Sequence, residues 1–79
     1  MITTEQISDR IVAAIATFGP EREAVTLDAT FEALDVDSLD MVELSQIVHD
    51  EYGVQITSDD MPKLRTVADA VELVAARAS

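Results

Sequence analysis

The chain has 79 residues, of which 48% are hydrophobic and only 4% aromatic, and it contains no cysteine. Its 5 Lys and Arg against 16 Asp and Glu give a formal net charge of −11 at pH 7, which repels nucleic-acid phosphates and anionic lipid headgroups. These values exclude a disulfide framework, a cysteine nucleophile and a Cys-based zinc site, and the short length leaves no room for an enzyme cleft.

One domain over residues 1–79 is expected, close to the size at which a single core can hold a fold without metals or disulfides. The first residues include neither a basic leader nor an apolar signal core, and no apolar run approaches the roughly 20 residues that span a bilayer. The sequence therefore predicts a cytoplasmic monomer that binds neither membranes nor nucleic acid. Its negative field favours partners with Lys and Arg patches.

The first predicted helix begins at Thr3 and Gln6, which have the spacing of a capping box. Gly19 and Pro20 predict its end near Phe18, because Gly tolerates a left-handed C-terminal position and Pro cannot continue the hydrogen-bond ladder. Apolar residues between these signals recur at steps of three and four and form one stripe: Ile7, Ile11, Ala14, Ile15 and Phe18.

Residues 21–36 show no helical period and predict a long loop between the first and second helices. Apolar residues are nevertheless spaced through this segment, at Val25, Leu27, Phe31 and Leu34. We expect these side chains to hold the loop against the core, so that it is ordered and is not a flexible linker.

The second predicted helix begins at Asp37 or Ser38 and runs to about Tyr52, where Gly53 ends it. One face of this helix is expected in the core and holds Leu44, Ile47, Val48 and Tyr52, with Met41 at its edge. The opposite face mixes apolar and acidic residues: Leu39, Val42, Glu43, Gln46 and Asp50. Isolated apolar surface residues are common, but the net charge favours a docking face for a basic partner, to which Asp37 and Asp40 also contribute.

The rest of the chain predicts a short turn and a last helix. Ser58 is a candidate cap for a turn over residues 59–61, with Pro62 at its close or at a bend. Thr66 and Asp69 have capping-box spacing ahead of an apolar stripe made of Val67, Ala70, Val71, Val74 and Ala78. With no strand-like alternation, the pattern predicts an all-α fold: a small bundle of three main helices plus one short helix.

Ser38 stands between two acids at the start of the second helix, where serine alone is often only a helix cap. Nucleophilic catalysis by a serine needs a base within hydrogen-bond reach. The only histidine, His49, lies about three turns along the same helix, roughly a dozen ångströms beyond that reach. A self-contained serine enzyme is therefore not expected, and a group attached to Ser38 by an outside enzyme fits the residue better.

The run Asp37-Ser38-Leu39-Asp40 resembles the prosthetic-group site of the acyl carrier protein family. Other residues occur in the family's order and extend the resemblance over nearly the whole chain: Phe31, Leu34, Val42, Glu43, Leu44, Ile56 and the Thr66-Val67-x-Asp69 start. The resemblance implies a covalent 4'-phosphopantetheine on Ser38, whose thiol holds acyl groups as thioesters. It implies a non-catalytic carrier that serves phosphopantetheinyl transferase, ketosynthase, acyltransferase and other synthase enzymes with basic docking patches.

The resemblance also suggests that the bundle shelters an acyl chain among core residues, although ordinary packing explains the same residues equally well. The candidate lining is Phe31, Leu44, Ile47, Ile56, Met61, Leu64 and Val71. Asp35 replaces a frequent glycine, which is a mild departure from the family pattern because Asp tolerates left-handed backbone angles. Two other departures bear on partner choice: Gln46 replaces a frequent apolar residue and His49 a frequent acid.

Fatty-acid and polyketide carriers share the Asp-Ser-Leu-Asp motif, so the sequence does not separate these two pathways. Carriers of peptidyl or D-alanyl groups are alternatives within the same fold. An unmodified acidic helical adaptor for a basic partner is the alternative from another class. A calcium loop beginning at Asp35 is rejected because Leu39, Asp40 and Gln46 occupy the wrong positions, and no metal site is assigned.

Overall fold

The computed structural model describes residues 3–78. Its elements are α1 (Thr4–Ala16), η1 (Arg22–Ala24), α2 (Ser38–Tyr52), η2 (Met61–Lys63) and α3 (Val67–Ala78), where η marks a 3-10 helix. The described residues contain no β-strand, only an isolated antiparallel bridge between Thr30 and Thr66. The predicted all-α bundle is confirmed, and the predicted short helix corresponds to the 3-10 turns. None of the helices within residues 3–78 is long and apolar enough to cross a membrane.

The α1 helix starts as its capping residues predict. The Thr3 hydroxyl accepts a hydrogen bond from the Gln6 backbone N–H, and the Gln6 side chain accepts one from the Thr3 N–H. The helix ends at Ala16, two residues before the predicted Phe18. Its last turn tightens there, since the backbone N–H groups of Thr17 and Phe18 donate to the carbonyls three residues before them, at 3.1 and 2.9 Å.

The loop from residue 21 to 36 is held to the core, as expected, by the buried side chains of Val25, Phe31 and Leu34. Leu27 does not contribute, because its side chain is 50% exposed, so this part of the expectation is wrong. The Leu27 backbone is instead tied to α3, since its carbonyl accepts the Ala68 N–H at 2.9 Å. Backbone bonds on both sides of the Thr30–Thr66 bridge therefore fix the loop against the start of α3.

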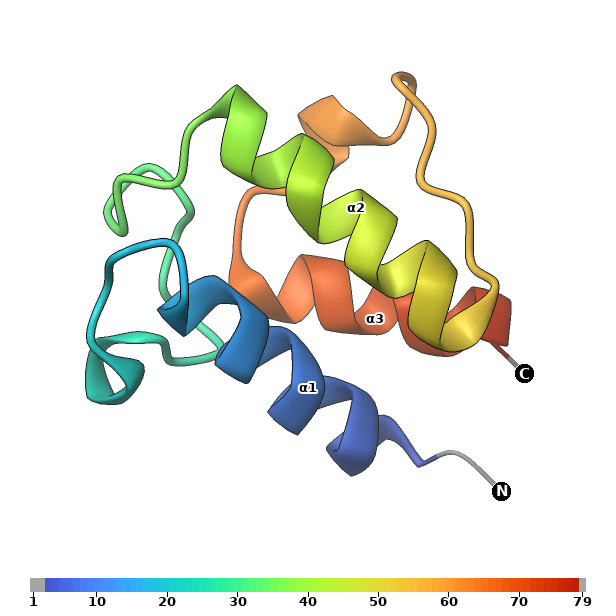
Figure 1. Cartoon of the computed structure of the whole chain (residues 1–79), viewed down its shortest axis with the longest axis horizontal. Coiled ribbons are helices and arrows are strands. Elements are labelled where there is room, and N and C mark those ends of the chain that lie inside the picture. The colour runs from blue at the N-terminus through green and yellow to red at the C-terminus, as the bar shows by residue number, and fades with distance from the viewer. Residues whose placement is uncertain (1–2, 79) are drawn as a thin grey trace.

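The core fills the space between the three long helices and is built almost entirely from aliphatic side chains. Both α2 and α3 contact α1. In Figure 1, the start of α1 and the end of α3 lie at the same end of the bundle. The contact between α1 and α3 is the most extensive. The largest fully buried side chains are Ile7, Ile11, Ile15, Leu44, Val48, Val54, Val67 and Val74.

The segment between α2 and α3 differs in detail from the prediction. Gly53 ends α2 in the left-handed conformation, with φ 68°, as expected. The short helix, however, begins at Met61 and has Asp60 as its N-cap residue, so Ser58 does not cap it. Pro62 lies inside η2 and does not close it, because proline fits the first turn of a helix, where its missing N–H costs nothing.

The start of α3 carries the predicted capping pair. The Thr66 hydroxyl accepts from the Asp69 backbone N–H at 3.2 Å, and the Asp69 carboxylate accepts from the Thr66 N–H at 3.1 Å. The backbone N–H groups of Thr66 and Arg65 together hold the pKa of Asp69 below its usual value. The cap therefore includes a carboxylate that is stabilised in its charged form.

Candidate functional site

The N-terminus of α2 is capped by Asp37, not by Ser38. The Asp37 carboxylate accepts the backbone N–H of Asp40 at 2.9 Å, and the Asp40 carboxylate accepts the Asp37 N–H at 3.4 Å. Ser38 is the first residue of the helix, it is exposed, and its hydroxyl makes no hydrogen bond to any residue within 3–78. The local structure thus leaves this hydroxyl available for chemistry.

The segment leading into Ser38 is held in a defined shape. Asp35 adopts a left-handed backbone angle, φ 57°, which Asp tolerates better than most side chains. Val36 is buried, and its N–H donates to the Phe31 carbonyl at 3.0 Å. The turn at Asp35 and the buried Val36 therefore fix the backbone directly before Ser38.

A phosphodiester on Ser38 would lie at the end of α2 where the first backbone N–H groups have no partner within the helix and the helix dipole is positive. The two neighbouring acids, Asp37 and Asp40, are engaged with backbone N–H groups of the capping box. The site therefore offers a serine oxygen without a hydrogen-bond partner within residues 3–78 and a helix end that favours a phosphate, while the like charge of the two acids opposes the phosphate locally.

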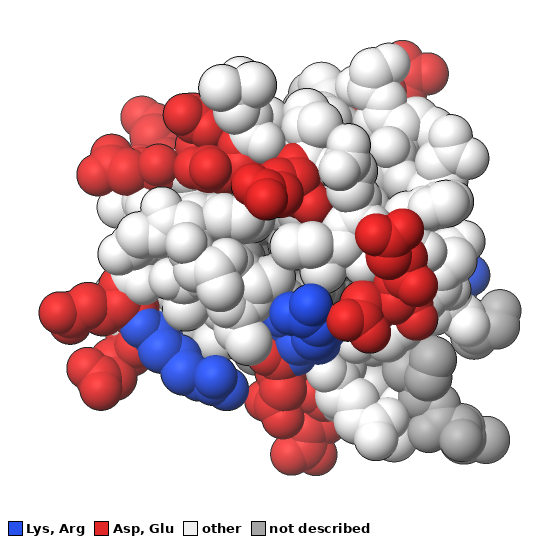
Figure 2. All heavy atoms as spheres, viewed as in Figure 1, with Lys and Arg blue, Asp and Glu red and all other residues white. Residues whose placement is uncertain are grey.

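The predicted docking face of α2 lies at the surface. Leu39 is 77% exposed and Val42 is 48% exposed, and these are two of the three large apolar side chains exposed among the described residues. Four other residues of the predicted face, Asp37, Glu43, Gln46 and Asp50, are exposed, and Asp40 is half-buried. Figure 2 shows acidic side chains in several groups across one face of the molecule, with fewer basic ones, mostly in the lower half.

An open cavity of about 440 Å³ lies beside Ser38, between the start of α2 and η2. Three of the seven residues predicted to contact an acyl chain line it: Phe31, Met61 and Leu64. Residues that the sequence did not indicate complete the lining, namely Val36, Met41, Val42 and Pro62, together with Asp37 and Ser38. The cavity is therefore largely apolar and reaches the attachment point.

The remaining four predicted lining residues lie elsewhere. Leu44 and Val71 are buried in the bundle core, and Ile47 is half-buried on α2. Ile56 lines a separate depression of about 340 Å³ with polar residues of α2 and the following loop. This second depression includes His49, whose Nδ1 lies 3.9 Å from the Asp50 carboxylate at the surface.

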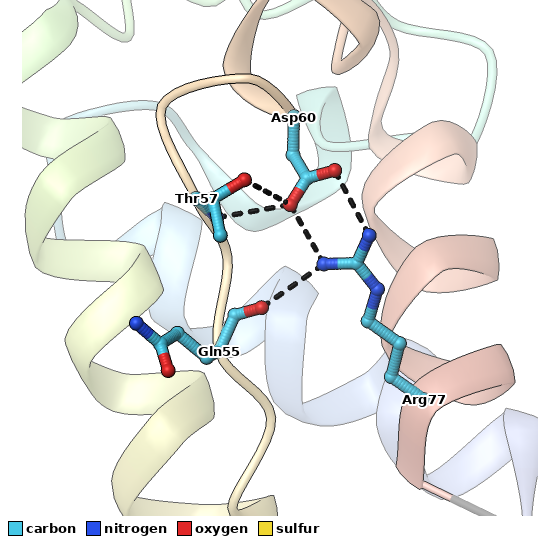
Figure 3. Close-up of polar contacts among 4 residues, drawn as sticks. All are labelled: Gln55, Thr57, Asp60 and Arg77. Carbon is cyan, nitrogen blue, oxygen red and sulfur yellow. Dashed lines mark hydrogen bonds and ion pairs between the residues drawn. The ribbon is translucent and has the colours of Figure 1, made fainter.

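A polar contact that the sequence did not indicate fixes the loop before η2 (Figure 3). Arg77 donates from Nη1 to one oxygen of Asp60 at 2.7 Å and from Nη2 to the other at 2.9 Å. Nη1 also donates to the Gln55 carbonyl at 3.0 Å, and Asp60 accepts from both the N–H and the hydroxyl of Thr57 at 2.9 Å. The Arg77 guanidinium, followed by Thr57, holds the pKa of Asp60 well below its usual range.

Comparison with known protein families identifies what this site resembles. A family model described as a phosphopantetheine attachment site matches residues 9–74. The chain is 35% identical over 81 aligned residues to a protein of Rickettsia canadensis named acyl carrier protein, with 100% of this chain and 94% of the relative covered. It is 40% identical over 75 residues to the acyl carrier protein of Lactobacillus johnsonii, covering 92% and 94% respectively.

Proposed function

Because the chain belongs to the acyl carrier protein family and has its phosphopantetheine attachment domain, we propose that Ser38 bears the 4'-phosphopantetheine arm. The carrier then presents acyl groups, held as thioesters on the arm's thiol, to enzymes of fatty-acid or polyketide synthesis. The observation that supports this assignment best is the exposed Ser38 hydroxyl, which is free because Asp37 performs the capping.

The carrier is non-catalytic in this proposal, and the loading enzyme supplies the base that serine needs. His49 is exposed eleven residues along α2, which corresponds to roughly 16 Å of axial rise from Ser38. Within residues 3–78 no three His, Asp or Glu side chains form a group that could hold a metal ion. The chain's own contribution is therefore to expose the hydroxyl and to present a recognisable surface around it.

The partner surface in this proposal consists of the residues around Ser38 on α2. Leu39 and Val42 enter shallow apolar pockets of the partner, and Glu43 and Asp50 contact its Lys and Arg side chains. Phosphopantetheinyl transferase, ketosynthase and acyltransferase are the partners of this kind that acyl carrier chemistry requires. The carrier acts as a cytoplasmic monomer, in keeping with its strong negative charge.

Intact-mass measurement after incubation with coenzyme A and a broad-specificity phosphopantetheinyl transferase tests the proposal. One added arm in the native chain and none in Ser38→Ala is the expected result. An unmodified native chain, under conditions that load a known acyl carrier, would leave the acidic adaptor as the better assignment.

The cargo distinguishes the carrier types. Acyl groups on the arm are expected, because the relatives above are named acyl carrier proteins. Mass analysis of the chain isolated from its host, after cleavage of the thioester, would identify the group. An aminoacyl or D-alanyl group would favour the peptidyl or D-alanyl alternative.

A further inference from the structure

One wall of the cavity beside Ser38 is held by a buried polar contact as well as by apolar packing. This wall is η2, whose Met61 and Pro62 line the cavity together with Met41 of α2. Met61 packs against the core while half-buried, and over residues 55–63 the only buried residue is Asp60, which is 5% exposed. The position of the wall therefore depends in part on what holds the Asp60 carboxylate.

Arg77 supplies that attachment from the last turn of α3. Its guanidinium binds both Asp60 oxygens and the Gln55 carbonyl, so it joins the end of α3 to two points of the loop before η2. Figure 3 shows the arginine reaching from α3 to the loop, where the carboxylate of Asp60 and the backbone carbonyl of Gln55 point toward it. A bidentate contact of this kind fixes orientation as well as distance, which a lysine cannot do.

We propose that Arg77 is a positioning residue for the acyl cargo, because through Asp60 it holds Met61 and Pro62 as the wall of the cavity that receives the proximal part of a chain tethered at Ser38. The inference rests on the proposed attachment at Ser38. Without Arg77, the buried Asp60 charge has no cationic partner, so the segment around it opens to solvent. The helices stay packed because the buried side chains of their core lie outside η2, which adds only the half-buried Met61 at its edge.

The first test uses amide hydrogen exchange on the unmodified chain. In Arg77→Gln, the Lys63 and Leu64 amides, which donate within η2, are expected to lose several-fold in protection. The Val67 and Ala68 amides, which donate to the loop carbonyls of Ala29 and Leu27, are expected to keep theirs. Equal protection of Lys63 and Leu64 in both proteins would overturn the proposal.

Arg10→Gln is the matched control. It removes the same type of side chain from an ion pair of similar length, Arg10 to Glu51 at 3.0 Å, and neither residue lines the cavity. This variant is expected to leave η2 protected. If it released η2 to the same extent, the effect would be general destabilisation, and the positioning role would be rejected.

The second test measures the cargo, using chain loaded with an octanoyl-phosphopantetheine arm and labelled at the methionine methyl groups. Met41 of α2 and Met61 of η2 both line the cavity, so both methyl resonances are expected to shift on acylation in the native chain. In Arg77→Gln the Met61 shift is expected to be lost and the Met41 shift to persist in reduced form. Arg77→Lys, which keeps the charge but cannot donate to both Asp60 oxygens in the same planar geometry, is expected to give an intermediate Met61 shift.

The outcomes separate the two proposals. A Met61 resonance that is unaffected by acylation in the native chain, or a shift that persists in Arg77→Gln, contradicts the positioning role. The mass of the same sample shows independently whether Ser38 carries the arm, so the attachment can stand while the positioning role fails. Circular dichroism of each variant verifies that its helices remain folded.

Discussion

The carboxylate of Asp37 accepts the backbone N–H of Asp40 at 2.9 Å, so the residue before the serine caps α2. A serine in the first turn and an aspartate at the cap are both common in helices, and either one could have taken the capping role. Since Asp37 takes it, the hydroxyl of Ser38 is not needed for stability. In the proposed assignment, capping and modification thus belong to adjacent residues, Asp37 and Ser38.

Alanine substitutions at these two residues are expected to differ in their effect on the free energy of unfolding. Ser38→Ala should change the free energy of unfolding by less than about 0.5 kcal/mol, because an exposed hydroxyl with no partner is removed. Asp37→Ala should cost about 1 kcal/mol, which is typical for the loss of an N-cap. Urea denaturation followed by circular dichroism measures both, and a larger loss in Ser38→Ala would show that the hydroxyl has a structural role.

Reversal of charge on the docking face is expected to slow loading. Glu43→Lys should remove about 1 kcal/mol of binding to a basic transferase, which corresponds to roughly a fivefold fall in kcat/KM at low salt. Added NaCl should narrow the difference from the native chain. Glu72→Lys makes the same change on the exposed surface of α3 and should load normally; similar losses in both variants would point to net charge, not to a defined face.

The apolar part of the same face can be tested separately. Leu39→Ala should weaken recognition by about 1 to 2 kcal/mol, the value of burying a leucine side chain in a partner's pocket, and should leave stability unchanged because Leu39 is 77% exposed. Leu27→Ala is the control, since Leu27 is 50% exposed and lies outside the predicted face. Loading kinetics that are the same in both variants would show that Leu39 is not part of the partner-binding face.

Asp60 should make stability depend on acidic pH. Its pKa in the folded chain lies well below the ordinary value of 3.8, chiefly because Arg77 donates to its carboxylate. The stabilisation is complete above that ordinary value and is lost as the pH falls, because the unfolded chain takes up the proton first. The difference in unfolding free energy between the native chain and Asp60→Asn should therefore be constant from about pH 7 to 5 and should shrink below pH 3.8.

Gly53 should be costly to replace for a purely conformational reason. A Cβ at this position would meet no atom within 4 Å, but the backbone is left-handed, with φ 68°. Gly53→Ala should therefore reduce the free energy of unfolding by about 1 kcal/mol. Gly53→Asn should lose less, because asparagine tolerates this conformation better, and equal losses in the two variants would contradict the conformational explanation.

Most of the bundle could be predicted from local patterns. The geometry of three signals depends only on residues within one helical turn and not on the rest of the chain. They are the capping pairs Thr3–Gln6 and Thr66–Asp69 and the glycine after Tyr52. The apolar spacing predicts an end near Phe18, two residues beyond Ala16, because it does not record the change to 3-10 backbone bonds at Thr17 and Phe18.

The candidate site could be predicted only in part. The serine and the exposed face follow from one helix, whereas the cavity is formed by three segments that meet through tertiary packing. Arg77 and Asp60 are 17 positions apart, and each alone resembles an ordinary surface charge. Nothing in the sequence pairs them, so neither the contact between Arg77 and Asp60 nor the position of η2 could be predicted from local patterns.

The bridge between Thr30 and Thr66 has a consequence for the order in which the chain matures. The loop before Ser38 takes its long-range backbone partners from residues 65–68, which are synthesised after the serine. The turn at Asp35 can form from local bonds alone, whereas its attachment to α3 has to wait for those later residues. Ser38 is therefore synthesised before the loop behind it can be fixed to the bundle.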